Sequence, residues 1–373
     1  MTDEGYPRGR AAFGITNNKC EGVLWLIIHT APTVVATISA ILNLVILSVS
    51  KGSHSNPSSF ILIFKEEKTM FTVLEKRVLS SDGVHELIGK IYLPEGERKG
   101  YFHLVHGMDE YIGRYENTCA FLAEQGYIVF AYDHLGHGAT GLADNSLGFF
   151  ASKDGWRLLV KDVKVFADAV RAEYGDLPYY LMGHSMGSFV VRLTTVMEGA
   201  PDKLIIMGTG GPNPAAGAGI AMAKCLRAIK GEKGVSKPLL GMAFGAYNAR
   251  FKEEKDRVAW LTKNKKVREN YKKDPLCTFP FTVSAMEDLV TLNKKCNTKA
   301  HFDAFPKTLP TLFVSGTEDP VGDYGKGVTF AAEELTKRGC KVTKKLYENC
   351  RHEILNDTCR DEVLADILAF IKK

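Results

Sequence analysis

The chain has 373 residues, of which 45% are hydrophobic and 24% are charged, and its formal net charge is +5. These values are near the averages for soluble globular proteins and exclude a collagen-like, a disordered or a many-spanning membrane protein. At about 150 residues per domain, the length allows two to three domains or one large α/β domain with additions. Eight scattered cysteines without a C-x-x-C pair or zinc-ligand spacing predict free thiols in a reducing compartment.

The first 69 residues form an N-terminal extension that differs in composition from the rest. Residues 22–50 contain no Asp, Glu, Lys or Arg, and this run exceeds the roughly 20 residues that cross a bilayer. It predicts a single membrane-spanning helix or an unusually long signal sequence, followed by a polar linker at residues 52–59. The expected location is therefore a membrane. The alternative is a cytoplasmic protein whose working chain starts at Met70.

Beyond Met70, strand-type and helix-type patterns alternate, which is typical of an α/β fold with a mostly parallel sheet. Residues 73–80 and 85–93 predict an antiparallel hairpin. Residues 156–170 carry apolar side chains at helical spacing. Short apolar runs predict buried strands at residues 101–105, 127–132, 179–182, 203–207, 311–314 and 341–347.

Residues 212–301 interrupt the alternation with helical stretches, so we expect a helical cap between two core segments, 70–211 and 302–373. Residues 213–301 hold 18 basic and 8 acidic side chains. No nucleic-acid-binding motif accompanies this charge, so nucleic acid is not an expected partner. Met222, Cys225, Leu226 and Ile229 share one helix face, whereas Lys224, Arg227 and Lys230 take another. This pattern fits a basic amphipathic helix at a membrane surface, or a cap helix that packs its apolar stripe onto the core.

The chemistry centres on Ser185, which lies in the pattern Gly-His-Ser-Met-Gly between a predicted strand and a predicted helix. Small residues at both ends of this pattern permit the sharp turn that presents a nucleophilic serine. A serine hydroxyl needs a base and an acid that orients the base, in the order Ser, acid, His along the chain.

Two histidines follow the serine, and His352, directly after a strand, is the better candidate than His301. For the acid, Asp319 is favoured over Glu318. The oxyanion formed in such a reaction needs backbone N–H donors, which we assign to Met108 and Met186. His106 and Gly107, at the end of an early strand, are assigned to substrate binding.

From about residue 71 to its end, the chain resembles the monoacylglycerol lipase and lysophospholipase group of the α/β-hydrolases, also described as serine aminopeptidase-like (S33). The resemblance is carried by five motifs in order: residues 106–110, 133–138, 183–187, 319–321 and 351–353. Two residues depart from it, because Asp109 and Tyr111 stand where lipid-cleaving members often have Gly and His. The resemblance implies an α/β-hydrolase fold with an inserted helical cap and a monoacylglycerol or lysolipid substrate.

We therefore expect a serine hydrolase that cleaves carboxylic esters through an acyl-serine intermediate. Ser185 is the expected nucleophile, His352 the base and Asp319 the orienting acid. No metal or organic cofactor is expected, and the expected partners are a lipid or other small ester and a membrane surface. The alternatives are an aminopeptidase-like hydrolase and a non-catalytic ligand-binding homologue.

Overall fold

The computed structural model describes residues 70–373, in which eight strands form one sheet in the order β1-β2-β4-β3-β5-β6-β7-β8. The pairs β1–β2 and β2–β4 are antiparallel, and the other neighbouring pairs are parallel. The opening hairpin and the six later strands confirm the sequence prediction. The strands are β1 (Phe71–Leu79), β2 (Glu86–Pro94), β3 (Tyr101–Val105), β4 (Ile128–Tyr132), β5 (Tyr179–His184), β6 (Lys203–Met207), β7 (Thr311–Gly316) and β8 (Val342–Tyr347).

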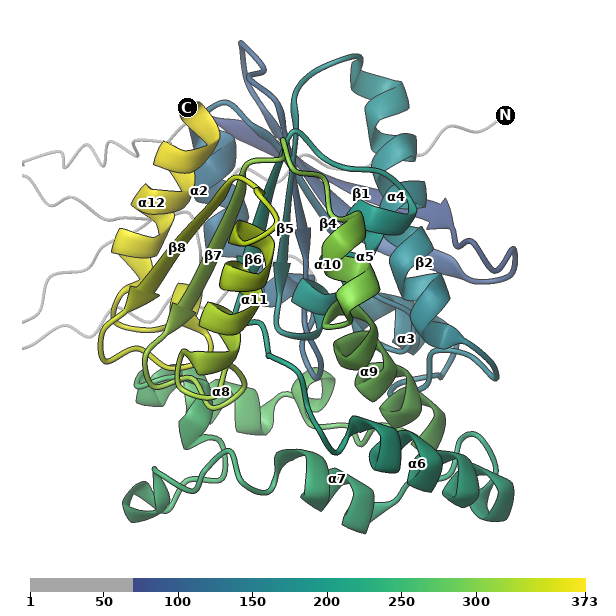
Figure 1. The fold of residues 1–373 in the computed structure, drawn as a ribbon. Helices are drawn as coiled ribbons and strands as arrows, with labels where there is room; N and C mark the ends of the chain where they lie inside the picture. Colours follow the sequence, from purple (N-terminus) through teal and green to yellow (C-terminus); the bar gives the residue numbers. More distant parts are fainter. Residues whose placement is uncertain (1–69) are drawn as a thin grey trace, which may run out of the picture. The chain divides into compact units, whose positions relative to one another are not determined.

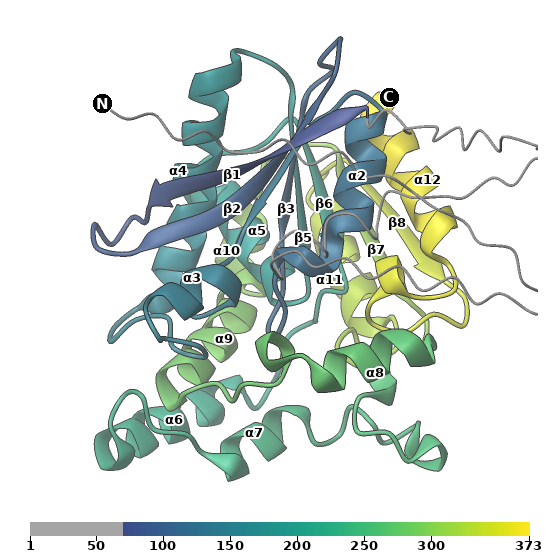
Figure 2. The ribbon, with the colours of Figure 1, turned by 180° about the vertical axis from the view of Figure 1, so that it is seen from behind.

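Helices cover both faces of the sheet (Figures 1 and 2). On one face lie α2 (Glu116–Glu124) and α12 (Arg360–Lys372), and on the other lie α4 (Gly155–Tyr174), α5 (Met186–Met197) and α11 (Lys326–Thr336). The remaining helices are α3 (Gly138–Ala143), α6 (Ala216–Lys230), α7 (Lys237–Phe244), α8 (Lys265–Lys273), α9 (Val283–Cys296) and α10 (Lys299–Ala304).

The central strands are mainly apolar because both of their faces are buried. In β3, for example, Tyr101 and Val105 join the core under α4 and α5, whereas Phe102 and Leu104 join the core under α2 and α12. Parallel strands also bring their carboxyl ends to one edge of the sheet, where binding and catalytic loops gather. The expected catalytic residues all follow such strand ends.

The helices α6 to α10 are inserted between β6 and β7. In Figures 1 and 2, α6, α7 and α8 lie together beyond the end of the sheet at which β7 and β8 end. By contrast, α9 runs back and packs against α4 and α5. This insertion covers the edge where the catalytic loops lie, and α10 crosses the expected cap boundary at residue 301.

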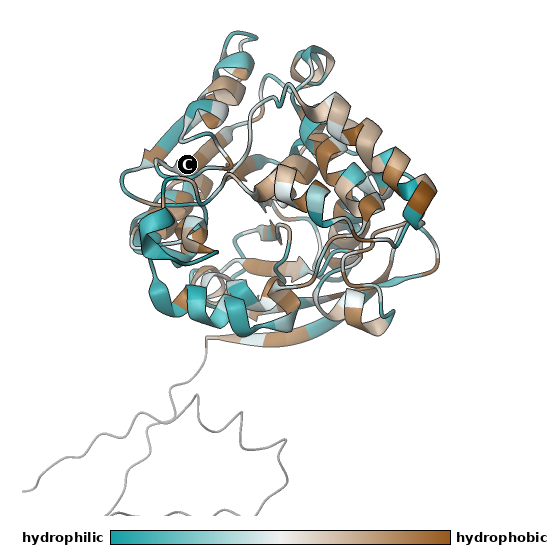
Figure 3. Cartoon of the chain, turned by 90° about the horizontal axis from the view of Figure 1, so that it is seen from below, coloured by the Kyte–Doolittle hydropathy of each residue, from teal (hydrophilic) through white to brown (hydrophobic). Residues whose placement is uncertain are grey.

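The predicted basic amphipathic helix is α6, and most of its apolar stripe faces solvent. Ile229 is 79% exposed and Met222 is 37% exposed, whereas the small side chains of Ala216 and Ala223 are buried. Figure 3 views the molecule from the side on which α6 and α7 lie and shows hydrophobic and hydrophilic residues alternating on the helices there. Of the predicted stripe, Leu226 packs against the core, whereas Met222, Cys225 and Ile229 face solvent.

The prediction of a membrane location through a single N-terminal helix is corrected. Among the helices of residues 70–373, none combines the length and the apolar character that a bilayer crossing requires. The run at residues 22–50 that prompted the prediction lies outside the described residues. A charge-free stretch in a sequence is compatible with a spanning helix but does not establish one.

Candidate active site

Ser185 lies on the sharp turn between β5 and α5. Its backbone has φ 53° and ψ −119°, a left-handed conformation that a non-glycine residue adopts only when its surroundings enforce it. The flanking glycines make the turn possible. A Cβ on Gly183 would lie 2.3 Å from the carbonyl oxygen of Gly187, and a Cβ on Gly187 would lie 2.3 Å from that of Val105. The Gly-x-Ser-x-Gly spacing is thus a packing requirement.

Asp319 and His352 meet although 33 positions separate them in the sequence. Asp319 follows β7, His352 follows β8, and the Asp319 carboxylate accepts a 3.0 Å hydrogen bond from His352 Nδ1. The carboxylate also accepts hydrogen bonds from the Ser315 hydroxyl and the Val321 N–H, both of 2.9 Å. Burial alone raises the pKa of Asp319, but the interactions with His352, the Ser315 hydroxyl and the Val321 N–H together outweigh burial and lower it. Asp319 is therefore held ionised beside the imidazole.

Glu318, the competing acid, points elsewhere. Its carboxylate lies 3.1 Å from Lys263 Nζ and 3.6 Å from Arg351 Nε. Likewise His301, the competing histidine, is buried in α10 and contacts Phe302 and Phe305. The structure thus brings Asp319 and His352 together and leaves both competitors apart from them.

A cavity of about 330 Å³ connects the nucleophile with the histidine. Ser185, His352, Met108 and Met186 are all among the residues that line it. Met186 is the first residue of α5, and the first N–H groups of a helix have no partner within the helix. Its N–H, at the positive end of the helix dipole, is therefore available to an oxyanion beside Ser185.

His106 and Gly107, assigned to substrate binding, are not among the residues that line this cavity. His106 is fully buried: its Nδ1 bonds to the Gly107 carbonyl and its Nε2 accepts from the His134 N–H. A Cβ on Gly107 would lie 2.8 Å from the Cβ of Ser185. In the structure these two residues shape the loop that presents Met108.

Sequence reasoning missed a buried network centred on Glu110. Its carboxylate accepts hydrogen bonds from the Gly107 N–H and, at 2.9 Å, from the Tyr115 hydroxyl and His184 Nδ1. The other ring nitrogen of His184 lies 3.4 Å from the His352 carbonyl oxygen. Both nitrogens of His184 thus face acceptors, which suits an imidazolium that donates twice.

Glu110 and His184 each stabilise the charged form of the other. Burial alone lowers the pKa of His184, but the charge and hydrogen bond of Glu110, the charge of Glu353 and the His352 carbonyl together outweigh burial and raise it. Conversely, burial alone raises the pKa of Glu110, and the charge and hydrogen bond of His184 lower it below its ordinary value. The Glu110–His184 pair therefore ties the loop after β3 to the end of β5, and His184 in turn contacts the loop of His352.

A second ion pair connects the segment after β3 directly with the loop of His352. The Arg114 guanidinium donates two 2.6 Å hydrogen bonds to Glu353 and lies 3.3 Å from Glu110. From the cap side, the carbonyls of Trp260 and Leu261 accept hydrogen bonds from the N–H groups of His352 and Glu353. Glu110 and Glu353 stand in motifs that the sequence singled out, but their partners could not be inferred from spacing.

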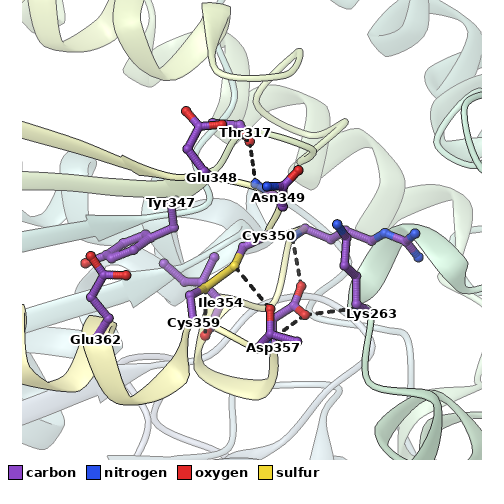
Figure 4. The surroundings of a disulfide bond; sticks show 12 residues. Lys263, Thr317, Tyr347, Glu348, Asn349, Cys350, Ile354, Asp357, Cys359 and Glu362 are labelled. Carbon is purple, nitrogen blue, oxygen red and sulfur yellow. Dashed lines mark hydrogen bonds between the residues drawn. A yellow bond between two sulfur atoms is a disulfide. The ribbon is translucent and has the colours of Figure 1, made fainter.

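The expectation of free thiols is wrong for Cys350 and Cys359, which form a disulfide (Figure 4). The loop that they close contains His352. Inside it, the Asp357 carboxylate accepts hydrogen bonds from the backbone N–H groups of Arg351 and Lys263, at 2.8 and 3.1 Å. Sequence alone could not pair these cysteines, because pairing depends on the turn after β8. The other cysteines among residues 70–373 are free.

Comparison with known proteins assigns the family. Residues 96–359, more than half of the chain, match serine aminopeptidase, S33. The chain belongs to this family. It is 27% identical to the human monoglyceride lipase over 281 residues, which cover 74% of this chain and 82% of that protein.

Two further proteins similar to this chain are also named as ester-hydrolysing enzymes. The chain is 25% identical to a monoacylglycerol lipase of Mycolicibacterium smegmatis over 298 residues, covering 76% of this chain and 92% of that protein. A solved structure of a Bacillus coagulans carboxyl esterase in complex with glycerol matches with a TM-score of 0.77 at 29% identity, covering 80% and 98% of the two chains.

The chain therefore has the α/β-hydrolase fold and is an ester-hydrolysing enzyme. These findings confirm the predicted fold class and the predicted class of enzyme. Within residues 70–373, no group of three or more His, Cys, Asp or Glu side chains is arranged to hold a metal ion.

Proposed function

We propose that this enzyme cleaves a monoacylglycerol or a related lysolipid through an acyl-serine intermediate. The observation that carries the proposal is that Ser185, on its strained turn, lines the same cavity as His352, which is bonded to buried Asp319. Ser185 attacks the ester carbonyl while His352 takes its proton and later returns it to the leaving alcohol. The N–H groups of Met108 and Met186 hold the oxyanion.

The lining of the cavity supports a lipid acyl chain. Phe189, Phe244, Leu289 and Val321 line the catalytic cavity and also a second cavity of about 210 Å³, which α6, α7 and α9 border. An apolar path therefore leads from the nucleophile towards the inserted helices. We propose residues 212–301 as a cap around this path, over a core of residues 70–211 and 302–373. The relatives named monoglyceride lipase and the esterase solved with glycerol favour the same substrate class.

The proposal is tested by incubating the full chain with 1-monoacylglycerols of increasing acyl length, a lysophosphatidylcholine and an aminoacyl anilide. We expect fatty acid release from the monoacylglycerols. The value of kcat/KM should rise with acyl length by up to about fourfold per CH₂, because each buried CH₂ contributes about 0.8 kcal/mol. Cleavage of the anilide without ester cleavage would contradict the proposal and favour the aminopeptidase alternative.

We further propose that α6 binds a lipid surface and delivers substrate to the apolar path. The exposed Met222 and Ile229 lie on the same helix as Lys224, Arg227 and Lys230. Such a helix rests at an interface through its apolar side chains and is drawn to anionic lipid by its basic ones.

Changing Lys224, Arg227 and Lys230 together to glutamine should weaken binding to anionic vesicles by tenfold or more. Each basic residue near an anionic leaflet contributes on the order of 1 kcal/mol, which salt reduces. The measurement is sedimentation with anionic and with neutral vesicles. A matched control changes three exposed lysines beside α11 and β8, Lys337, Lys341 and Lys344, to glutamine. Equal vesicle binding by the two triple variants would contradict this role of α6.

A further inference from the structure

Asp109 lies in the loop after β3, residues 106–110, which we call the oxyanion loop, and it has two features that the fold does not explain. It follows Met108, lines the catalytic cavity, and has φ 53° without being glycine. Asp109 as a whole is half-buried. Its Oδ1 oxygen is wholly enclosed and has no hydrogen-bond partner among the described residues. The neighbouring Glu110, by contrast, is fully engaged in the network described above.

Both features of Asp109 oppose folding. A left-handed backbone strains most residues other than glycine, although aspartate tolerates it better than most. An enclosed polar oxygen without a partner has lost its hydration and gained nothing in return. A glycine here would remove both penalties. Unfavourable local features that the fold does not use are typical of functional sites.

The surroundings of the Asp109 carboxyl indicate its protonation state. The charged group that acts on it is Glu110, a like charge, and Asp109 in turn acts electrostatically on the Tyr271 phenol of α8, which lines the same cavity. The guanidinium of Arg114 is engaged by Glu353 and Glu110. Burial, and then the charge of Glu110, raise the pKa of Asp109 well above its ordinary value. A neutral carboxyl both donates and accepts a hydrogen bond, which is what a hydroxyl group requires of a partner.

The position of Asp109 in the cavity indicates that it lies next to the alcohol portion of a bound ester, away from the acyl chain. The apolar residues that continue into the second cavity, Phe189 and Phe244 among them, suit the acyl chain. Asp109, Tyr271 and Thr278 line the catalytic cavity but not the second one. The polar lining next to the oxyanion loop is thus separate from the acyl path.

We propose that Asp109 determines specificity by hydrogen bonding to a hydroxyl group on the alcohol portion of the substrate, as in the glycerol of a monoacylglycerol. This inference rests on the proposed function, because it presupposes that Ser185 attacks an ester in this cavity. It predicts a preference for esters of polyols over esters of simple alcohols with the same acyl chain.

The test compares kcat/KM of the full chain for 1-octanoylglycerol and for ethyl octanoate. We expect Asp109→Ala to lower the ratio of these two values by tenfold or more, because the hydroxyl loses its donor and acceptor. Asp109→Asn should keep the ratio within threefold, because an amide also donates and accepts. The matched control is Asp154→Ala, which removes an exposed aspartate of similar backbone, φ 51°, outside the cavity.

A second readout does not involve catalysis. Asp109→Gly should unfold at a higher temperature than the unmodified protein, because it relieves the backbone and removes the unpaired oxygen. A lower unfolding temperature would show that Asp109 serves the fold, and this would overturn the proposal.

The activity outcomes are equally distinct. An unchanged selectivity ratio in Asp109→Ala would overturn the proposal, and so would equal losses in the alanine and asparagine variants, since these would show that a charged carboxylate binds a cationic group. Failure of the unmodified protein to cleave either ester would instead refute the proposed function.

Discussion

Replacing Ser185 with alanine is expected to lower kcat/KM for a p-nitrophenyl ester by roughly three to six orders of magnitude, because the alanine variant has no nucleophile. Replacing His352 with alanine, or Asp319 with asparagine, should have effects in the same range. Double variants should lose little more, because the three side chains act as one unit. The measurement is steady-state hydrolysis by the full-length variants, each checked for folding by circular dichroism.

The neighbouring acid provides the control for this prediction. Glu318→Gln removes a carboxylate that pairs with Lys263 and Arg351 and makes no contact with His352 in the structure. Its activity should therefore stay close to that of the unmodified enzyme. If Glu318→Gln were inactive and Asp319→Asn active, the orienting acid would be Glu318 and not Asp319.

Replacing Glu110 with alanine should lower the free energy of unfolding by about 3–5 kcal/mol, because it strands buried charges that have no access to water. The side chains of Glu110, His184 and Arg114 are at most 10% exposed. Urea denaturation measures the effect. The control is Glu116→Ala, whose exposed ion pair with Lys90 should contribute less than about 1 kcal/mol. A loss below about 1 kcal/mol in Glu110→Ala would contradict the role of the network.

The same pair predicts how this stability depends on pH. Glu110 has a lowered pKa, so its contribution is present above the unfolded value of about 4.3 and is lost as the pH falls through the folded pKa. His184 has a raised pKa, so its contribution is present below about 6.5 and is lost as the pH rises through the folded pKa. The stability difference between the unmodified protein and Glu110→Ala should be largest between about pH 4.3 and 6.5.

Local patterns in the sequence were sufficient to predict the strands of the sheet and to nominate the candidate triad. Buried parallel strands are short apolar runs, and Ser185, Asp319 and His352 each follow one of them. The order of nucleophile, acid and base along the chain then restricts the choice to few residues. Such features depend on neighbours in sequence, and this is why they could be inferred.

Contacts between distant residues could not be inferred in this way. The bonds of Glu110 to His184 and of Arg114 to Glu353 join segments 74 and 239 positions apart. The unpartnered oxygen of Asp109 becomes visible only once the cavity is formed. The apolar face of α6 is a different case: its spacing was correct, but only the packed structure shows that Ala216 and Ala223, rather than Ile229, turn inward.

The central claim, that Ser185 becomes acylated during ester cleavage, is tested most directly with a fluorophosphonate, which reacts with an activated serine and remains bound. Mass spectrometry of the labelled full chain should find one adduct per molecule, on the peptide that contains Ser185. Asp319→Asn, with its histidine no longer held by a carboxylate, should label far more slowly. An adduct on a different residue, or none on an enzyme that still hydrolyses esters, would contradict the account.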